Sequence, residues 1–303
     1  MMKKVAIIMS TYNGERYIEE QLKSILNQTY KNIDIYIRDD CSTDGTVKII
    51  EKYRSCSRLH FIKGEKNMGY PEGFYYLMNQ DIEADYFSFS DQDDVWEPEK
   101  IERAVDNLER MNKNVPLLYF AAYDLCDQYL NHIKVLPNIK FTPSFRNSLF
   151  QCLALGYTMV MNKKAKDICA NRRSVKTVSK DVWIGMICSG LGEVIFDNRS
   201  CAKYRRNDGA FSVSNTNFLS VQKERFYKLF KNNGFNNINK LMVEFFEVFE
   251  DELPDERKKE LELFMPQKYS FRKVVKKIFY PYRLRYSVID ELLLRMMFLL
   301  GKV

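Results

Sequence analysis

Short apolar runs alternate with amphipathic segments along roughly the first ninety residues of the chain. Four runs have the composition of strands, at residues 5–9, 33–37, 59–62 and 86–90. The first run is continuously apolar, which is typical of a strand buried on both faces of a parallel sheet. Between the first two runs, apolar residues recur at helical spacing, at Ile18, Leu22, Ile25 and Leu26. This alternation predicts a β-α-β-α-β unit and therefore an α/β fold.

Polar residues follow the predicted strands where the strands end. Residues 10–14 form a polar turn, Asp39 and Asp40 close the second strand, and residues 91–94 contain three aspartates. Open parallel sheets bind ligands at this carboxyl edge. Ordinary polar turns are the alternative, although acidic residues at two strand ends make it less attractive. Because the chain contains neither GxGxxG nor GxxxxGK[ST], it must hold any nucleotide without those loops.

Composition limits the classes of partner. The 303-residue chain is 46% apolar with a net charge of +7, so it can form a sizeable core and favours an anionic partner. Nucleotide phosphates and an acidic membrane surface fit that charge, whereas no RRM, KH or zinc pattern supports nucleic acid. Seven cysteines without a CxxC pair favour reduced thiols in a cytoplasmic protein. We expect no signal peptide, and the apolar run 292–300 is too short to span a bilayer.

Five segments together resemble the family 2 glycosyltransferases, which have the GT-A fold. They are Ser-Thr-Tyr-Asn-Gly-Glu at 10–15, residues 21–30, Asp-Asp-Cys-Ser-Thr-Asp-Gly-Thr at 39–46, Asn-Met-Gly at 67–69 and Asp-Gln-Asp-Asp at 91–94. Their order and spacing follow the family over about residues 4–110 and more weakly to about 215. The resemblance implies a GT-A type nucleotide-binding sheet flanked by helices. Residues 90–96 and 289–295 are also similar to bacterial rhamnosyltransferase-like members.

The expected organisation is a GT-A catalytic domain at 1–215 and a helical C-terminal region at 216–303. Residues 1–94 are expected to form the nucleotide-sugar half of the catalytic domain, and residues 95–215 the acceptor half. The boundary lies where the sequence becomes charged, helical in pattern and rich in Phe. Two further elements are expected, an amphipathic helix at 97–111 and a strand at 117–123.

The acidic segment at 91–94 predicts a cation site. Three carboxylates within four residues repel one another, and hard oxygen ligands suit Mg²⁺ or Mn²⁺ on a diphosphate. Spacing alone favours a solvated acidic turn that caps the next helix equally well. By resemblance, Asp91 and Asp93 are the DxD pair, with Asp91 also contacting the nucleotide and Asp93 the direct metal ligand. Asn207 stands where a histidine often completes the family's metal site, and its amide oxygen remains a weaker ligand.

The resemblance also implies a nucleotide-binding set. The family's counterpart of Asp40 receives the N–H of a pyrimidine base, and a carboxylate acceptor favours uracil or thymine over cytosine. The alternative for Asp40 is an N-cap of a helix that starts near Thr43, a role that Ser42 fits better. Four further residues are expected at the nucleotide, although a turn explains the last two nearly as well: Thr11, Asn13, Asn67 and Gly69.

Asp181 is the candidate catalytic base, because it occupies the place of the family's acceptor-side aspartate. Lys180 precedes it where the family has His or Glu. The alternative is an aspartate that complements a helix dipole. Trp183 either stacks on the acceptor sugar or packs in the core. Arg205 and Arg206 either clamp the diphosphate or form a basic turn.

The segment 268–289 is basic and aromatic. Seven Lys and Arg residues and no acidic residue occur there, interleaved with apolar side chains. This composition predicts a peripheral membrane contact, which would suit a lipid-linked acceptor at the inner face of the plasma membrane. A solvated helix that packs its apolar side on the catalytic domain is an equally good explanation.

The leading functional hypothesis is an inverting, metal-dependent sugar transfer from a UDP- or dTDP-sugar to a glycan or lipid-linked glycan in surface polysaccharide synthesis. The subfamily resemblance favours L-rhamnose as the sugar. Lys180 and Asn207 keep open a non-catalytic nucleotide-sugar-binding subunit of a glycan assembly complex. A nucleotidyltransferase would need a glycine- and lysine-rich loop after the first strand, and residues 10–15 contain no lysine.

Overall fold

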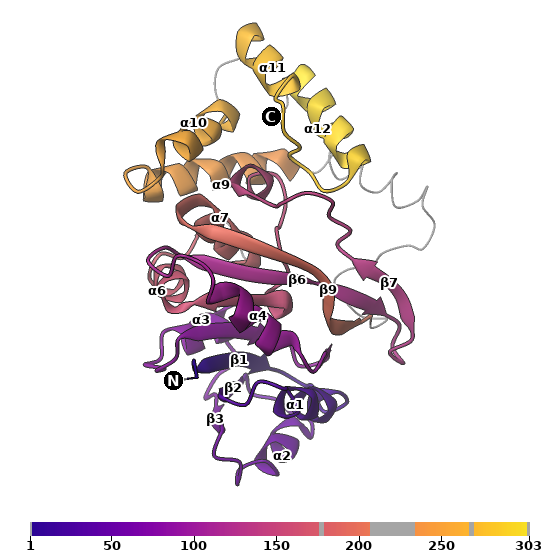
Figure 1. The fold of residues 1–303 in the computed structure, drawn as a ribbon. Helices are drawn as coiled ribbons and strands as arrows, with labels where there is room; N and C mark the ends of the chain where they lie inside the picture. Colours follow the sequence, from indigo (N-terminus) through magenta and orange to yellow (C-terminus); the bar gives the residue numbers. More distant parts are fainter. Residues whose placement is uncertain (1, 176–178, 207–233, 267–269, 302–303) are drawn as a thin grey trace.

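The computed structural model describes residues 2–175, 179–206, 234–266 and 270–301 (Figure 1). Within these residues one sheet of nine strands lies at the centre, in the order β3-β2-β1-β4-β8-β6-β9-β5 with β7 paired to β6. The strands are β1 (Val5–Thr11), β2 (Ile33–Asp39), β3 (Leu59–Lys63), β4 (Tyr86–Ser90), β5 (Val95–Trp96), β6 (Leu117–Cys126), β7 (His132–Leu136), β8 (Met159–Asn162) and β9 (Glu193–Arg205). The helices are α1 (Ile18–Leu26), α2 (Thr46–Glu51), α3 (Glu72–Met78), α4 (Lys100–Leu108), α5 (Phe145–Ser148), α6 (Lys163–Asn171), α7 (Lys180–Leu191), α9 (Gly234–Phe249), α10 (Asp255–Phe264), α11 (Phe271–Ile278) and α12 (Val288–Leu299).

The strands β1 to β4 form a parallel half-sheet, in which β1 and β4 are buried on both faces and the edge strand β3 is mostly exposed or half-buried. Along β1, Val5, Ile7 and Met9 join the core under α1, whereas Ala6 and Ile8 join the core under α3. Burial on both faces is the reason why this run is continuously apolar. All four predicted strands are confirmed, and three of them extend one or two residues beyond the predicted end.

The other half of the sheet is mixed. β8 runs antiparallel to both β4 and β6, and β6 runs parallel to β9. The strand expected at 117–123 is confirmed as β6, which continues to Cys126. Most side chains of β9 are only partly buried, so its sequence carries little apolar pattern and did not predict the strand.

Two predicted helix starts are wrong. The helix after the second strand is α2, which begins at Thr46 with Gly45 as its N-cap. The Ser42 hydroxyl, expected to cap it, instead donates to Asp39 at 2.5 Å. The helix expected at 97–111 is α4, which is shorter because the N–H of Glu97 still donates to the carbonyl of Cys201 in β9.

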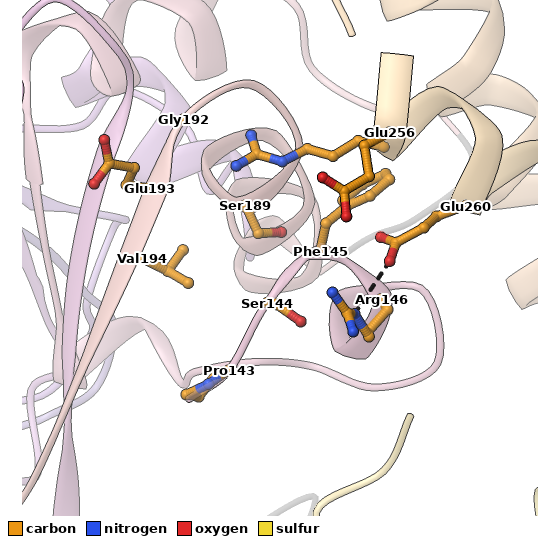
Figure 2. A pocket seen from close by; sticks show the side chains of 11 residues that line it. Pro143, Ser144, Phe145, Arg146, Ser189, Gly192, Glu193, Val194, Glu256 and Glu260 are labelled. Atoms are coloured by element: carbon orange, nitrogen blue, oxygen red, sulfur yellow. Dashed lines mark ion pairs between the residues drawn. The ribbon is translucent and has the colours of Figure 1, made fainter. Parts of the chain in front are cut away.

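The C-terminal helices pack on the sheet domain and share its core. Phe245 and Phe249 of α9 lie against Trp183 of α7, and Phe264 of α10 lies edge-on to Phe150. Figure 2 shows a pocket of about 290 Å³ at this junction, where Arg146 and Glu260 form an ion pair of 3.2 Å. The proposed boundary near residue 215 falls outside the described residues. None of the described helices is both long and apolar enough to cross a membrane.

Candidate functional site

The carboxyl ends of β1, β2 and β4 meet at one edge of the sheet, because these strands are parallel neighbours. A pocket of about 480 Å³ opens there. It brings together six of the residues expected from the sequence: Thr11, Asp40, Asn67, Gly69, Asp91 and Asp93. Five more residues line it that the sequence had not singled out: Ser10, Tyr12, Tyr70, Phe74 and Gln92. Tyr12 and Tyr70 are 47% and 57% exposed, so their rings are available to a planar base or a sugar.

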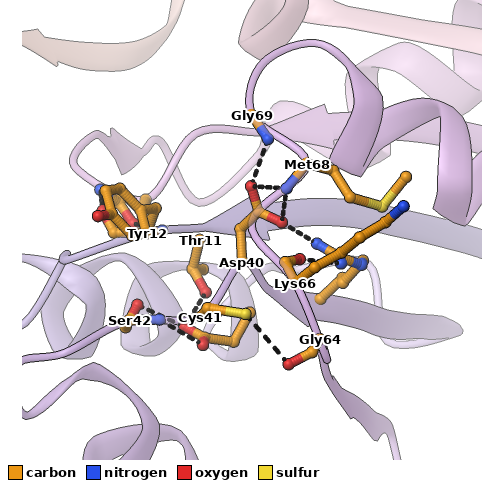
Figure 3. Close-up of polar contacts among 12 residues, drawn as sticks. Thr11, Tyr12, Asp40, Cys41, Ser42, Gly64, Lys66, Met68 and Gly69 are labelled. Atoms are coloured by element: carbon orange, nitrogen blue, oxygen red, sulfur yellow. Dashed lines mark hydrogen bonds and ion pairs between the residues drawn. The ribbon is translucent and has the colours of Figure 1, made fainter.

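Asp40 fastens the turn at 67–69 to the end of β2 (Figure 3). Its carboxylate accepts from the N–H of Met68 at 2.8 Å, from the N–H of Gly69 at 2.6 Å and from Arg38. Burial alone would raise the pKa of Asp40, but these hydrogen bonds and the Arg38 charge outweigh it and hold the pKa below its usual value. Asp40 is therefore an anion that orders one wall of the pocket.

Asn13 joins two turns and is not among the residues that line the pocket. Its side-chain oxygen accepts from the N–H of Thr43 at 2.8 Å, and its own N–H donates to Ser42 at 2.9 Å. Its φ of 48° is a left-handed conformation that asparagine tolerates better than most residues. The contacts of Asn13 therefore hold the turn after β1 against the turn after β2.

Gln92, the middle residue of Asp-Gln-Asp, bridges the ends of β1 and β4. Its amide accepts from the N–H of Tyr12 at 2.9 Å and donates to the carbonyl of Tyr12 at 3.0 Å. A Cβ on Gly14 would lie 2.4 Å from the Gln92 oxygen, so a side chain at position 14 would displace the end of the Gln92 side chain. The bridge fixes the acidic segment against the pocket wall.

The negative charges of the Asp91 and Asp94 carboxylates are only partly compensated by the surrounding protein groups. Burial, followed by the charges of Asp93 and Asp181, raises the pKa of Asp91 to about 6 against an opposing effect of Lys180. Asp94 is 1% exposed, and neither of its oxygens has a hydrogen-bond partner of ordinary geometry among the described residues. Burial raises the pKa of Asp94 well above its usual value, and the nearby Lys100 only partly offsets this.

Such an excess of carboxylate oxygen fits a divalent cation. Within the described part of the chain, however, no three His, Cys, Asp or Glu side chains gather into a complete metal cage. A cation held at Asp91 and Asp93 would therefore need further ligands, which a diphosphate can supply. The expected ligand Asn207 lies outside the described residues.

Lys180 and Asp181 open α7 as a close pair. The Lys180 ammonium is 2.7 Å from Oδ1 of Asp181, and the N–H of Gly156 donates to Oδ2 at 2.7 Å. Lys180 is 2% exposed and lies 4.3 Å from the ring centroid of Phe74 and 4.8 Å from that of Phe89. Burial would lower the pKa of Lys180, but the charges of Asp181, Tyr70 and Asp91 together with the hydrogen bond to Asp181 outweigh it and raise the pKa.

Arg205 is 6% exposed and is hydrogen-bonded to the backbone of the acidic segment. Its guanidinium donates to the carbonyl of Asp93 at 3.2 Å, to the carbonyl of Gln128 at 2.8 Å and to Glu20 at 2.5 Å. With its donors used in this way, Arg205 positions Asp93 in this structure and is not among the residues that line the pocket. Arg206, at the end of β9, donates its N–H to Cys126.

Trp183 is 0% exposed and packs in the core, the second of the two roles that the sequence left open. Its indole N–H donates to the carbonyl of Arg172 at 2.6 Å, and Phe245 lies edge-on to its ring. A sugar cannot reach it in this structure.

Comparison with known proteins identifies the family. Residues 6–167 match the family model described as glycosyl transferase family 2. The chain belongs to glycosyl transferase family 2. This family member is 32% identical over 185 residues to dTDP-rhamnosyl transferase RfbG of Shigella flexneri, over 58% of this chain but only 62% of that relative. It is 29% identical to the putative teichuronic acid biosynthesis glycosyltransferase TuaG of Bacillus subtilis, over 73% of this chain and 86% of that protein.

The solved structures agree on the fold. TarS 1–349 of S. aureus has a TM-score of 0.60 at 19% identity, over 99% of this chain and 81% of that chain. The expected GT-A type fold and family are thus confirmed. Within this family 2 chain, sequence reasoning missed Tyr70 and Gln92, whose positions depend on contacts between strand ends. Asp94 belonged to the acidic segment that predicted a cation site, although it was not named as a ligand.

Proposed function

We propose that this glycosyltransferase transfers a sugar with inversion from a UDP- or dTDP-sugar, with a divalent cation, and that Asp181 is its base. One observation carries the proposal: the Lys180 ammonium that pairs with Asp181 at 2.7 Å lies 4.3 Å from the ring centroid of Phe74, which lines the same pocket as Asp91 and Asp93. A donor-side anionic site and an acceptor-side carboxylate are thus near each other, as an in-line displacement requires.

The residues act as follows. Thr11, Asn67 and Gly69 line the part of the pocket that would hold the nucleotide. Asp40 lines the same part, and its carboxylate would accept the imide N–H of uracil or thymine. Asp91 and Asp93 would hold Mg²⁺ or Mn²⁺, which supplies Lewis-acid stabilisation of the leaving diphosphate. Asp181 accepts the proton of an acceptor hydroxyl while that oxygen attacks the anomeric carbon. The bond between this carbon and the diphosphate oxygen breaks on the opposite face, which inverts the configuration.

The donor class is supported by the names of relatives. RfbG is called a dTDP-rhamnosyl transferase, and TarS has been solved with UDP-GlcNAc and with UDP. A mannosyltransferase with a TM-score of 0.52 to this chain has been solved with GDP-Man and Mn²⁺. We favour L-rhamnose as the sugar because RfbG is the relative whose name agrees with the rhamnosyltransferase-like segments.

The proposed acceptor is a glycan or lipid-linked glycan in surface polysaccharide synthesis, at the cytoplasmic face of the membrane. TuaG, whose name refers to teichuronic acid biosynthesis, supports the pathway class. The segment 268–289 supports the location, because its basic and aromatic composition suits an interface. Residues 268 and 269 of this segment lie outside the described residues.

A thermal-shift panel of UDP-, dTDP- and GDP-sugars, with and without Mn²⁺, tests the donor. Ligand that binds the native state raises the melting temperature in proportion to its affinity. The stabilising donor is then used in hydrolysis and transfer assays of the wild type, Asp93→Ala and Asp181→Ala. Wild type should turn over and both variants should lose activity. If all three bound nucleotide and were equally inert, the chain would be a non-catalytic nucleotide-sugar-binding subunit.

A further inference from the structure

α12 is apolar on two opposite faces. Its inner face packs Leu294, Met297 and Phe298 into the core, where they are at most 3% exposed. The outer face presents a stripe at helical spacing whose side chains are 37–64% exposed: Val288, Leu292, Met296 and Leu299. A helix with apolar residues on two opposite faces is normally covered on both. The second face of α12 therefore lacks a cover in the described part of the chain.

The exposed apolar side chains of this protein concentrate in the same region. Of the seventeen large apolar side chains that are exposed among the described residues, nine lie within residues 271–300. Scattered exposed apolar residues need no explanation, but a contiguous patch marks an interaction site. Figure 1 shows α11 and α12 together at the end of the molecule opposite α2.

α11, which packs against α12, contributes aromatic and basic side chains to this end. Val274 faces the core, whereas Phe271 and Phe279 are 70% and 77% exposed. The exposed side chains between them are Arg272, Lys273 and Lys276. None of these three forms an ion pair with another described residue, in contrast to Arg295 of α12, which pairs with Glu291 at 2.7 Å.

We infer that the outer faces of α11 and α12 dock together on an anionic lipid bilayer, with the α12 stripe inserted among the acyl chains and the α11 cations at the headgroups. Charge complementarity favours this occupant over a second copy of the chain, which would bring three like charges to the same surface. Aliphatic side chains beside aromatic and unpaired basic ones are the composition of an interfacial helix. The inference adds α12 to the membrane contact already proposed for 268–289. It does not depend on the role assigned to any active-site residue.

Flotation of the full chain with vesicles tests the inference. Wild type should float with phosphatidylcholine vesicles that contain about a third phosphatidylglycerol, and about tenfold less with pure phosphatidylcholine or at high salt. Leu292→Gln with Leu299→Gln should reduce flotation at least about tenfold, as should Arg272→Gln with Lys273→Gln and Lys276→Gln. The matched control is Ile133→Gln with Val135→Gln on β7, where the side chains are 46% and 45% exposed, and it should float like wild type.

Two further measurements make the outcome decisive. Circular dichroism and the melting temperature with UDP and Mn²⁺ should be the same for all variants, which separates lipid binding from folding and from nucleotide binding. Wild type that stays unbound, or a Leu292→Gln, Leu299→Gln variant that floats like wild type, would overturn the inference. It would also be overturned if wild type eluted as a dimer that these two substitutions split, because the stripe would then join two copies.

Discussion

The ammonium of Lys180 lies 2.7 Å from Oδ1 of Asp181, inside a wall of aromatic rings from Tyr70, Phe74 and Phe89. Together with the Gly156 N–H on Oδ2, this contact holds both oxygens of the carboxylate in place. The Lys180 charge also opposes the rise in the pKa of Asp91. One buried cation therefore interacts with two carboxylates, one proposed to act on the donor side and one proposed as the base.

Lys180→Met should lower the kcat of transfer about 10- to 100-fold while leaving the KM for the donor within about threefold, because it releases the proposed base without touching the nucleotide end. Loss of a buried partner should also cost roughly 3 kcal/mol of unfolding free energy. Lys180→Arg, which keeps the charge, is the matched variant and should recover part of kcat. An unchanged kcat in Lys180→Met would remove Lys180 from the mechanism.

Asp181→Asn should abolish measurable transfer, a loss of about 10² to 10⁴, because the amide cannot accept the proton of the acceptor hydroxyl. The amide oxygen can still accept from Gly156, so the fold and the melting-temperature rise with UDP should persist. Steady-state transfer and thermal shift on the same samples check this. Transfer above about a tenth of wild type would show that another group is the base.

Arg205→Met should weaken the binding of nucleotide with Mn²⁺ about tenfold, because hydrogen bonds to charged groups contribute about 1.5–3 kcal/mol and this one holds the Asp93 carbonyl. Titration calorimetry with UDP and Mn²⁺ measures the effect. Glu20→Gln removes the charge of one guanidinium partner but leaves the Asp93 contact, so it should have a much smaller effect. Equal effects of the two substitutions would contradict a positioning role toward Asp93.

Trp183→Ala should destabilise the protein by about 3–5 kcal/mol, because it removes a fully buried indole from the contact with Phe245. Trp183→Phe keeps most of the packing and should cost about 1–2 kcal/mol, mainly through the lost hydrogen bond to Arg172. Denaturant unfolding measures both values. Folded Trp183→Phe should keep the wild-type KM for the acceptor, and a large rise in KM would restore the stacking role.

Asp91 makes the free energy of unfolding of the metal-free protein depend on pH. Its pKa of about 6 in the folded state exceeds the usual 3.8, so the folded form binds a proton more readily than the unfolded form. The associated stability is fully present only below about pH 3.8 and is lost progressively as the pH rises from there through about 6. Asp91→Asn, which is always neutral, should therefore be more stable than wild type at pH 7.5 by about 1–3 kcal/mol, with the difference shrinking as the pH falls from about 6 and vanishing only below the usual pKa of 3.8.

The same titration should weaken cation binding. Because a proton and Mn²⁺ compete for the carboxylate, the melting-temperature rise caused by UDP with Mn²⁺ should shrink as the pH falls below about 6. Asp91→Asn should show little Mn²⁺ effect at any pH. A wild-type Mn²⁺ effect that is constant from pH 5 to pH 8 would argue against Asp91 as a ligand.

β1 was predictable because it is buried on both faces, which gives a continuous apolar run in the sequence. β9 was not predictable from the sequence, since its side chains are mostly half-buried and its partner strand β6 lies far away in the chain. The helix starts at Thr46 and Lys100 were misplaced for a related reason. Hydrogen bonds to distant residues, such as Glu97 to Cys201, override the local capping signal.

By itself, the sequence determined the family, the α/β class and the edge of the sheet where Thr11, Asp40 and the acidic segment meet. These follow from local composition and from parallel strands that end at one edge. The tertiary structure alone decided that Trp183 lies in the core, that Arg205 supports Asp93 from behind and that Lys180 pairs with Asp181. Side-chain direction is set by packing against residues far away in the chain, so spacing in the sequence does not encode it. The uncovered face of α12 follows the same rule, because the sequence of a helix with apolar residues on two faces does not show which of the two the core covers.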